Sequence, residues 1–239
     1  MREESSARER LREDGPRSPV RVLYCGNFGR MHEVDTVVAA LRGGVPAGVQ
    51  FDFRGNGAGF QTLAAATAGL RSCRAGTASE CECGTQEIRN EGRRSEEVTG
   101  DNEPEGGGQL RLGGSLPERE WLEAMAAADV ALVTMKRGAE GIVMPSKTYS
   151  AMAAGQAILA VCPRESDLAD LVAEHDCGWV IEPGDVAGLR AVLDSLASLG
   201  AEVLAKRRNA WRAARECYDQ RVLAGRWREV LRGFAGRET

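Results

Sequence analysis

The chain has 239 residues, and its 43% hydrophobic and 28% charged residues are typical of a globular protein with a buried core. A formal net charge of -4 argues against a nucleic-acid-binding surface, and the one basic run, residues 206–212, is expected to be a solvated helix face. No apolar run approaches the roughly 20 residues that cross a bilayer, and the N-terminal residues lack the apolar centre of a secretory signal. We therefore expect a cytoplasmic protein without nucleic-acid partners.

The seven cysteines are an odd number and lie mostly in apolar stretches, which is typical of reduced, buried thiols rather than of a disulfide framework. Cys73, Cys81 and Cys83 cluster, but they form no C-x-x-C pair and have no second pair of ligands. The two histidines, His32 and His175, are far from this cluster in sequence and are expected at the surface or at helix ends. The sequence therefore predicts no metal site.

Two segments lack the composition of a folded core. Residues 1–18 are nearly all charged or small and predict a flexible tail before a single domain over residues 19–235. Residues 71–108 contain only Ile88 and Val98 as branched aliphatic residues and no aromatic residue. Such a segment cannot bury enough apolar surface to fold alone, so we predict a disordered insertion at the surface.

The domain begins with a strand, a glycine turn and a helix, and this unit then repeats. An apolar run is followed by the turn Gly26 to Arg30 and then by apolar residues at helical spacing. Consecutive strand–helix units indicate a parallel sheet. The predicted elements before the insertion are a strand at 20–25, a turn at 26–30, a helix through 34–41, a strand at 49–53, a turn at 55–59 and a helix at 60–70.

The same alternation continues after the insertion, so the sequence predicts an α/β fold: a single Rossmann-like domain with a parallel sheet flanked by helices. The predicted elements here are a strand at 110–114, a helix at 117–128, a strand at 130–134, a helix at 146–154, a strand at 157–161, a helix at 166–174, a short strand at 178–181 and a helix at 186–198.

The last helical region places two sets of residues at spacings of three and four: Trp211, Ala214 and Tyr218, and then Trp227, Leu231 and Phe234. A stripe with this spacing is typical of a helix that packs on a core, so we predict that these side chains are buried. We identify no amphipathic basic helix that would bind a membrane surface.

The segment from Glu140 to Gly155 predicts a loop that runs into a helix, with an acid at the loop's entrance. Pro145 suits a first helical turn, Ser146 can cap backbone donors, and the free amides at the helix start attract phosphate or hydroxyl oxygens. An ionised Glu140 only accepts hydrogen bonds, so its natural partners are hydroxyl groups. The combination suits a sugar nucleotide.

Five motifs follow one another along the chain: Gly26-Asn-Phe-Gly-Arg30, Phe53-Arg-Gly-Asn-Gly57, Ala128-Asp-Val-Ala-Leu-Val133, the stretch 140–155, and Gly178-Trp-Val-Ile-Glu-Pro-Gly184. In this order they resemble the C-terminal half of the family-4 retaining glycosyltransferases, and the Pro-Ser-Lys-Thr-Tyr wording is most similar to the branch of capsule and colanic-acid transferases. The resemblance covers about residues 20–235 apart from the insertion. It implies a GT-B fold, two Rossmann-like halves with the donor in the cleft between them, of which this chain carries only the second.

The resemblance also implies how the donor diphosphate is held. The family's first glycine loop packs against the diphosphate, which here involves Gly26, Asn27 and Gly29, and Arg30 matches the family's neutralising arginine. The lysine that usually follows several residues later is absent. Lys147, in the later loop, is our inferred replacement on grounds of charge.

The family's paired-glutamate motif places one acid against the donor sugar and a second near the ribose. Glu140 matches the first, with Gly141 and Ser146 beside it, and Ser150 stands where the second is expected. A serine bonds a ribose hydroxyl without charge, and a lost charge-assisted bond is worth roughly 1.5 to 3 kcal/mol. The chain offers no Asp-x-Asp metal pair outside the insertion, so we expect no metal and no cofactor.

These residues predict transfer of a sugar from a nucleoside diphosphate sugar to an acceptor hydroxyl with retention, in polysaccharide or glycoconjugate synthesis. Membrane association is expected only through a lipid-linked acceptor. The acceptor-binding half is missing, which leaves three explanations: a separate polypeptide, a truncated or misassigned reading frame, or a non-catalytic remnant that binds nucleotide sugars. A dehydrogenase would need G-x-G-x-x-G after the first strand, and a receiver domain would need acidic strand ends; the chain has neither.

Overall fold

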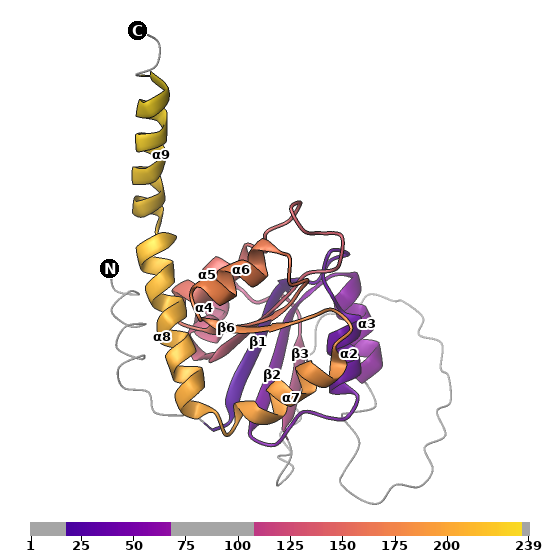
Figure 1. The fold of residues 1–239 in the computed structure, drawn as a ribbon. Coiled ribbons are helices and arrows are strands. Elements are labelled where there is room, and N and C mark those ends of the chain that lie inside the picture. The colour runs from indigo at the N-terminus through magenta and orange to yellow at the C-terminus, as the bar shows by residue number, and fades with distance from the viewer. Residues whose placement is uncertain (1–17, 68–107, 236–239) are drawn as a thin grey trace, which may run out of the picture.

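A computed structural model describes residues 18–67 and 108–235 of the chain (Figure 1). The predicted tail and insertion lie outside these residues, apart from Ser18 and Gly108. The described residues form a six-stranded parallel sheet with the order β3-β2-β1-β4-β5-β6, which confirms the predicted Rossmann-like sheet. The strands are β1 (Val20–Asn27), β2 (Val49–Asn56), β3 (Gln109–Gly113), β4 (Val130–Thr134), β5 (Ala157–Val161) and β6 (Gly178–Ile181).

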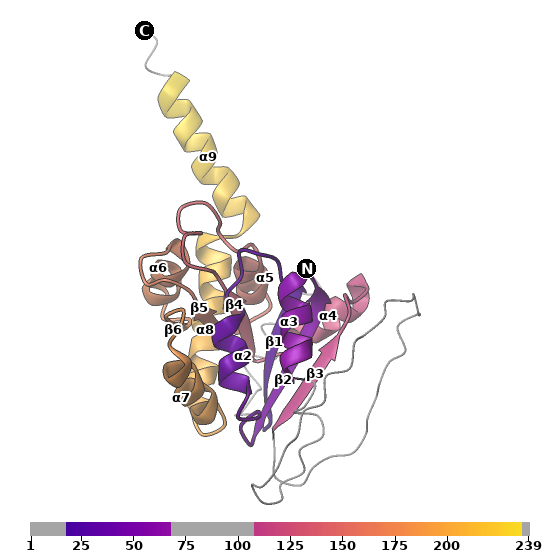
Figure 2. The same ribbon diagram turned by 90° about the vertical axis from the view of Figure 1, so that its right-hand side faces the viewer.

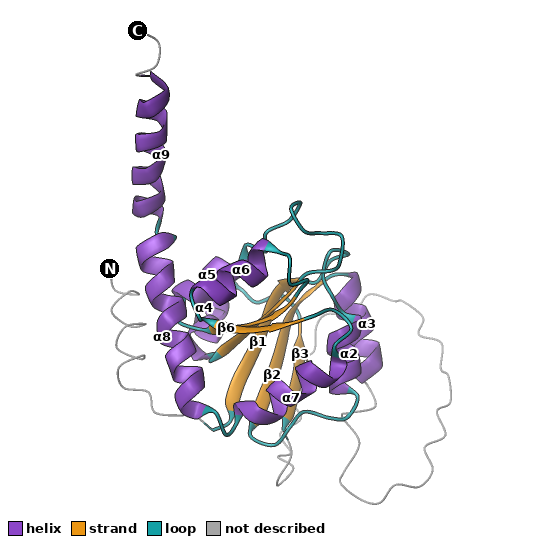
Figure 3. Cartoon of the chain, in the orientation of Figure 1, coloured by secondary structure: helices purple, strands orange, loops and turns teal. Residues whose placement is uncertain are grey.

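Helices cover both faces of this sheet (Figures 2 and 3). Helices α2, α3 and α7 share one core with the sheet, and α4, α5, α6 and α8 share the other, while Val203 of α8 also lies in the first core. The helices are α2 (Asp35–Leu41), α3 (Ala58–Thr67), α4 (Glu118–Ala127), α5 (Lys147–Ala153), α6 (Asp167–Glu174), α7 (Val186–Leu196), α8 (Gly200–Cys217) and α9 (Gln220–Ala235).

The strand sequences explain the two cores. In β1, Val22 and Tyr24 enter one core while Leu23, between them, enters the other, because successive side chains of a strand point to opposite faces. Every residue of β4 and β5 is buried, as expected for central parallel strands with helices on both sides. Continuous apolar runs of this kind are why the predicted bounds of β4, β5 and β6 match the structure.

The two glycine turns begin as strand rather than as turn. Strand β1 continues through Gly26 and Asn27, and β2 continues through Gly55 and Asn56, so that the two pairs lie side by side in the sheet. Gly55 has a φ of +146°, and a Cβ there would overlap the carbonyl oxygen of Gly26. The second turn therefore packs backbone against backbone on the first, which only glycine permits.

Helix α8 is fastened to the sheet by a buried ion pair. Arg207 is 3% exposed; its Nη1 lies 2.9 Å from Asp129 Oδ1, and its Nε donates to the carbonyl of Gly155 at 2.9 Å. Asp129 Oδ2 also accepts a hydrogen bond from the Arg21 amide at 3.0 Å. The prediction that the basic run 206–212 is a solvated face is therefore wrong for Arg207, whose charge Asp129 balances inside the protein.

Helix α9 leaves the body of the molecule and continues beyond the end of α8 (Figure 1). Its apolar side chains are exposed: Trp227 by 65%, Leu231 by 60% and Phe234 by 64%. The prediction that the final aromatic stripe is buried is wrong for α9, although Trp211 and Tyr218 are half-buried. Within the described residues, no helix combines the length and the apolar character needed to cross a bilayer.

Candidate functional site

The candidate site lies where the carboxyl ends of β1 and β4 meet. These neighbouring strands are the point where the strand order changes direction, and open α/β sheets bind ligands in the crevice at such a point. The turn after β1 and the loop after β4 are joined there, because the Lys136 amide donates to the carbonyl of Met31 at 2.9 Å. The first glycine turn and the glutamate loop, 110 residues apart in sequence at Arg30 and Glu140, therefore share one edge of the sheet.

Lys147 extends from the start of α5 across to the first glycine turn. Its Nζ donates to the carbonyl of Asn27 at 3.2 Å and to the hydroxyl of Tyr24 at 3.1 Å, and it lies 4.9 Å from the centre of the Tyr24 ring. A Cβ at Gly26, where φ is +131°, would lie 2.6 Å from Lys147 Cε. The structure therefore brings Lys147 together with two of the predicted turn residues, and the absence of a side chain at Gly26 makes room for it.

His32 holds the other side of Lys147. Its Nδ1 lies 2.9 Å from the Thr134 carbonyl oxygen and 3.1 Å from Thr134 Oγ1, and its Nε2 lies 3.3 Å from Lys147 Nζ. A carbonyl accepts only, so Nδ1 carries the proton and Nε2 accepts from the ammonium. The prediction of a surface histidine is wrong, because His32 is half-buried. In the sequence, His32 stands three residues after Gly29, in the turn that follows the first strand, and this position could have indicated that it belongs to the candidate site.

The surroundings set the charges of this pair. Burial lowers the pKa of Lys147 to about 8. Burial, with the nearby Lys147 charge, lowers the pKa of His32 to about 4. At neutral pH the site therefore presents an ammonium ion oriented by a neutral imidazole, a phenol and a backbone carbonyl.

Arg30 and Glu140 lie on the two joined loops rather than in contact with Lys147. The Arg30 side chain is exposed. Glu140 is half-buried, and its carboxylate accepts a hydrogen bond from the Gly138 amide at 2.7 Å, which fixes it within its own loop. Gly141, next to it, has a φ of +69° in the left-handed region that glycine tolerates. The roles of these residues toward a ligand stay predictions.

Ser146 and Ser150 are both exposed at the start of α5, on either side of Lys147. The expectation that Ser146 caps this helix is wrong: its backbone is already helical, with φ -59° and ψ -25°, and its side chain makes no capping hydrogen bond. A capping side chain needs the extended backbone of a true N-cap, which Ser146 does not have. The helix has only seven residues, Lys147–Ala153, and is shorter than predicted.

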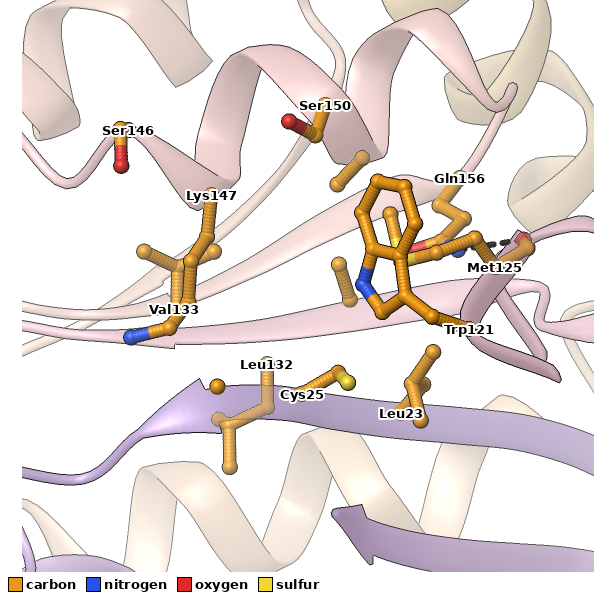
Figure 4. Close-up of a pocket in the computed structure, with 13 residues that line it drawn as sticks. Leu23, Cys25, Trp121, Met125, Leu132, Val133, Ser146, Lys147, Ser150 and Gln156 are labelled. Carbon is orange, nitrogen blue, oxygen red and sulfur yellow. Dashed lines mark hydrogen bonds between the residues drawn. The ribbon is translucent and has the colours of Figure 1, made fainter. Parts of the chain in front are cut away.

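A cavity of about 210 Å³ opens beside Lys147, between α4 and α5 (Figure 4). Gly26, Ser146 and Ser150 line it near Lys147, and the indole of Trp121 projects into it from α4. Its remaining lining is apolar apart from Cys25 and Gln156, and includes Leu23, Met125, Ala131, Leu132, Val133 and Ala151. Four predicted site residues therefore line one cavity: Gly26, Ser146, Lys147 and Ser150.

The amide of Gln156 is part of the inner wall of the cavity. The side chain is fully buried, and its Nε2 donates to the Met125 carbonyl at 2.6 Å, while Oε1 has no hydrogen-bond partner in the structure. An unpaired buried acceptor is costly unless a ligand or water satisfies it.

Among residues 18–67 and 108–235, no three histidine, cysteine or acidic side chains form a cluster that could hold a metal ion. Cys73, Cys81 and Cys83 lie outside the described residues. Cys162 and Cys177 are buried free thiols, and burial raises the pKa of each to about 11. These two thiols are inert packing groups, as predicted, whereas Cys25 and Cys217 are only half-buried.

Comparison with known proteins finds glycosyltransferases that are similar to this chain in sequence over part of its length or in fold. No family model matches the chain. The probable glycosyltransferase WbjE of Pseudomonas aeruginosa is 38% identical over 91 residues, which are 38% of this chain and 23% of that protein. WaaG, a glycosyltransferase involved in lipopolysaccharide biosynthesis, superposes with 92% of this chain and 48% of its own, with a TM-score of 0.54 and 18% identity. Anabaena Alr3699/HepE in complex with UDP-glucose matches 97% of this chain and 53% of its own, with a TM-score of 0.56 and 16% identity.

The fold is one half of a GT-B fold. This confirms the architecture that the motifs implied. The chain spans about half the length of the two solved structures and less of the Pseudomonas protein, so it corresponds to one of the two GT-B halves. The resemblance to capsule and colanic-acid transferases, and the role of each site residue in this GT-B half, stay predictions.

Proposed function

We propose that this chain is the nucleotide-sugar-binding half of a glycosyltransferase, with the donor diphosphate on the first glycine turn beneath Lys147. One observation carries this proposal: the Lys147 ammonium reaches the Asn27 carbonyl from another element and lies against the bare backbone of Gly26. A diphosphate placed on that turn meets a positive charge on one side and backbone amides on the other, which is the combination that binds phosphates.

We assign the neighbouring residues to the other parts of the donor. Arg30 is exposed at the end of the turn and adds a second cation for the diphosphate. Ser146 and Ser150 face the cavity that begins at Lys147, so we assign the ribose to them and the base to the cavity beside Trp121. Glu140, on the joined loop, is assigned to the hydroxyl groups of the sugar.

The proposed chemistry is electrostatic. As the bond between sugar and diphosphate breaks, negative charge grows on the leaving phosphate, and Lys147 and Arg30 stabilise that charge more than they stabilise the intact donor. Neutral His32 accepts from the ammonium without competing for its charge and so holds it in position. We propose that transfer proceeds to an acceptor hydroxyl with retention, in polysaccharide or glycoconjugate synthesis.

The acceptor is bound, in this proposal, by a second Rossmann-like half outside this sequence. The support is length: WaaG and HepE each contain about twice the part that this chain matches. The UDP-glucose bound to HepE makes a UDP-sugar the first donor to test.

A thermal-shift panel of UDP-, GDP- and ADP-sugars tests the donor site. At least one donor should stabilise the wild type, because a ligand at 100 times its Kd adds about 2.7 kcal/mol to the free energy of unfolding. Lys147→Met and Glu140→Ala should each reduce that shift. Lys206→Met is the matched control, since Lys206 is a mostly buried lysine on α8, paired with Asp176 away from the site. Equal shifts in Lys147→Met and wild type would remove Lys147 from the site, and no shift with any donor would contradict the proposal.

The alternative is a module that binds a nucleotide sugar without transferring it. The neutral Ser150, where the family pattern has an acid, favours this alternative. Adding a polypeptide that carries the N-terminal Rossmann pattern separates the two: sugar transfer or donor hydrolysis that depends on Lys147 identifies an enzyme, whereas donor binding with neither reaction identifies the module.

A further inference from the structure

The cavity beside Lys147 has a charged end and an apolar interior. The Lys147 ammonium and the indole of Trp121 lie at opposite ends of the residues that line it (Figure 4). The lining residues, all of them in the described part of the chain, include no aspartate or glutamate, and their hydroxyl groups are those of Ser146 and Ser150. The part of a ligand that extends into the cavity beyond Lys147 therefore meets mainly apolar groups.

We propose that the donor is a deoxythymidine diphosphate sugar, which this site prefers to the corresponding uridine diphosphate sugar. The inference rests on the proposed function, in which the diphosphate lies beneath Lys147, the ribose beside Ser146 and Ser150, and the base in the cavity. Deoxythymidine differs from uridine in two groups: it has an added methyl group on the base and lacks the 2′-hydroxyl group of the ribose. The lining residues favour the first difference and tolerate the second.

The size and the lining of the cavity favour a small base with an apolar edge. Its volume of about 210 Å³ is below the roughly 300 Å³ at which ligand pockets usually begin, so a one-ring pyrimidine fits better than a two-ring purine. The 5-methyl group of thymine lies on the ring edge that carries no N–H. It can point toward Met125, Ala131 and Val133 while the polar edge faces the open side of the cavity. Burial of this methyl group strengthens binding about fourfold or more.

Trp121 provides a flat surface for the base. Its side chain is half-buried, and the indole projects into the cavity from α4. A base that stacks on the indole gains contacts that depend little on its identity, because every base has a π face. Trp121 therefore holds the base in the cavity, and the apolar wall distinguishes thymine from uracil.

The groups assigned to the ribose distinguish it only weakly from deoxyribose. A site rejects a ligand that lacks a hydroxyl group when the loss leaves a buried polar group without a partner. Ser146 and Ser150 are exposed, so water replaces a missing 2′-hydroxyl group at either of them. In dinucleotide-binding folds a carboxylate holds the ribose hydroxyl group, whereas no carboxylate of the described residues lines this cavity. Loss of the 2′-hydroxyl group should therefore weaken binding less than about threefold.

Four nucleoside diphosphates separate the two groups: UDP, dUDP, 5-methyl-UDP and dTDP. Calorimetric titration of the full 239-residue chain at pH 7 measures the Kd of each, and omitting the donor sugar keeps its contribution out of the comparison. We expect the methyl group to strengthen binding about fourfold or more in both the ribose and the deoxyribose pair. The 2′-hydroxyl group should change binding less than about threefold. Consequently dTDP should bind more tightly than UDP, and GDP and ADP should bind more weakly than dTDP.

Two variants test where the nucleoside lies. Trp121→Leu removes the stacking surface and should weaken dTDP and UDP alike, by about fivefold or more. Ser150→Glu places a carboxylate beside the ribose and should make UDP bind about tenfold more tightly relative to dUDP. Ser198→Glu is the matched control, because Ser198 is exposed between α7 and α8, outside the cavity lining, and it should leave this ratio unchanged. Circular dichroism checks that each variant is folded, and the wild-type comparison decides the proposal even if Trp121→Leu is not.

Three outcomes would overturn the proposal. The first is UDP, GDP or ADP binding as tightly as dTDP or more tightly, in which case the nucleotide-sugar site stands and only its preference is wrong. The second is unchanged dTDP affinity in a folded Trp121→Leu protein, which would place the base outside the cavity. The third is binding of none of these nucleotides, together with no thermal shift from any donor, which would remove the proposed function and this inference with it.

Discussion

The two glycine turns have similar sequences and different tasks. A side chain at Gly55 would overlap the backbone of Gly26, and one at Gly57 would lie 2.6 Å from the Phe28 carbonyl oxygen, so the second turn supports the first. A side chain at Gly26 would instead meet the flexible end of Lys147. At Gly55 an added side chain would meet fixed backbone, whereas at Gly26 it would meet a cation that can move. This difference separates a structural glycine from a glycine in a candidate binding site.

Gly55→Ala should have the largest effect on folding. Its Cβ has no space between two paired strands, and its φ of +146° is strained for alanine, so the free energy of unfolding should fall on the order of 3 kcal/mol or more. Urea denaturation measures this loss. Gly114→Ala is the control, because a Cβ there has nothing within 4 Å, and it should change stability little. A Gly55→Ala protein as stable as the control would show that the second turn does not support the first.

Gly26→Ala should give the contrasting result. The φ of +131° costs roughly 1 to 2 kcal/mol for alanine, but the clash is with the end of a lysine side chain that can move. We expect a smaller loss of stability than for Gly55→Ala, together with about tenfold weaker donor binding, because Lys147 is pushed off the turn. Calorimetric titration with UDP-glucose and urea denaturation separate the two effects. Gly29→Ala should not reduce stability comparably, since its Cβ makes only ordinary contacts. Unchanged donor affinity in Gly26→Ala would detach Lys147 from the diphosphate.

The sheet could be predicted from sequence because each strand can be recognised from its own residues. Ala157–Val161 is apolar throughout and Val130–Thr134 is apolar up to Thr134, and such short runs rich in β-branched residues are typical of strands buried on both faces. The glycine turns and the glutamate loop were also local signals. Local sequence therefore predicted the fold and the edge of the sheet at which the site lies.

The contacts within the site could not be predicted in the same way. Lys147 meets Asn27 across 120 residues, which depends on β1 and β4 being neighbours in the sheet, and His32 enters the site through Thr134 of β4. The apolar stripe of α9 shows a related limit: spacing reveals which residues share a face, but not whether that face meets the core or the outside. Tertiary placement decided each of these cases.

Donor affinity should fall as the pH rises above about 8. Lys147 must be protonated to hold a diphosphate, and burial lowers its pKa in the unliganded protein to about 8. At pH 9 about a tenth of the molecules keep the proton, so the apparent Kd for UDP-glucose should be about tenfold higher than at pH 7. A bound diphosphate raises the pKa of Lys147 again, so donor affinity is lost progressively as the pH rises. Lys147→Met should bind weakly and without this dependence; a wild-type Kd that stays constant to pH 9.5 would contradict the role of Lys147.

A separate effect on stability belongs to His32, which contacts Lys147 and Thr134. Its pKa is lowered from 6.5 to about 4, so between these pH values the unfolded chain binds a proton that the folded chain does not. Stability therefore rises with pH across this window, and the contribution is lost as the pH falls from about 6.5 toward 4. His32→Gln removes the titration, and its urea midpoint should change less between pH 7 and pH 5 than the wild-type midpoint does. Carboxylates titrate in both proteins and cancel in the comparison, so parallel pH profiles would mean that His32 is not held neutral beside the lysine.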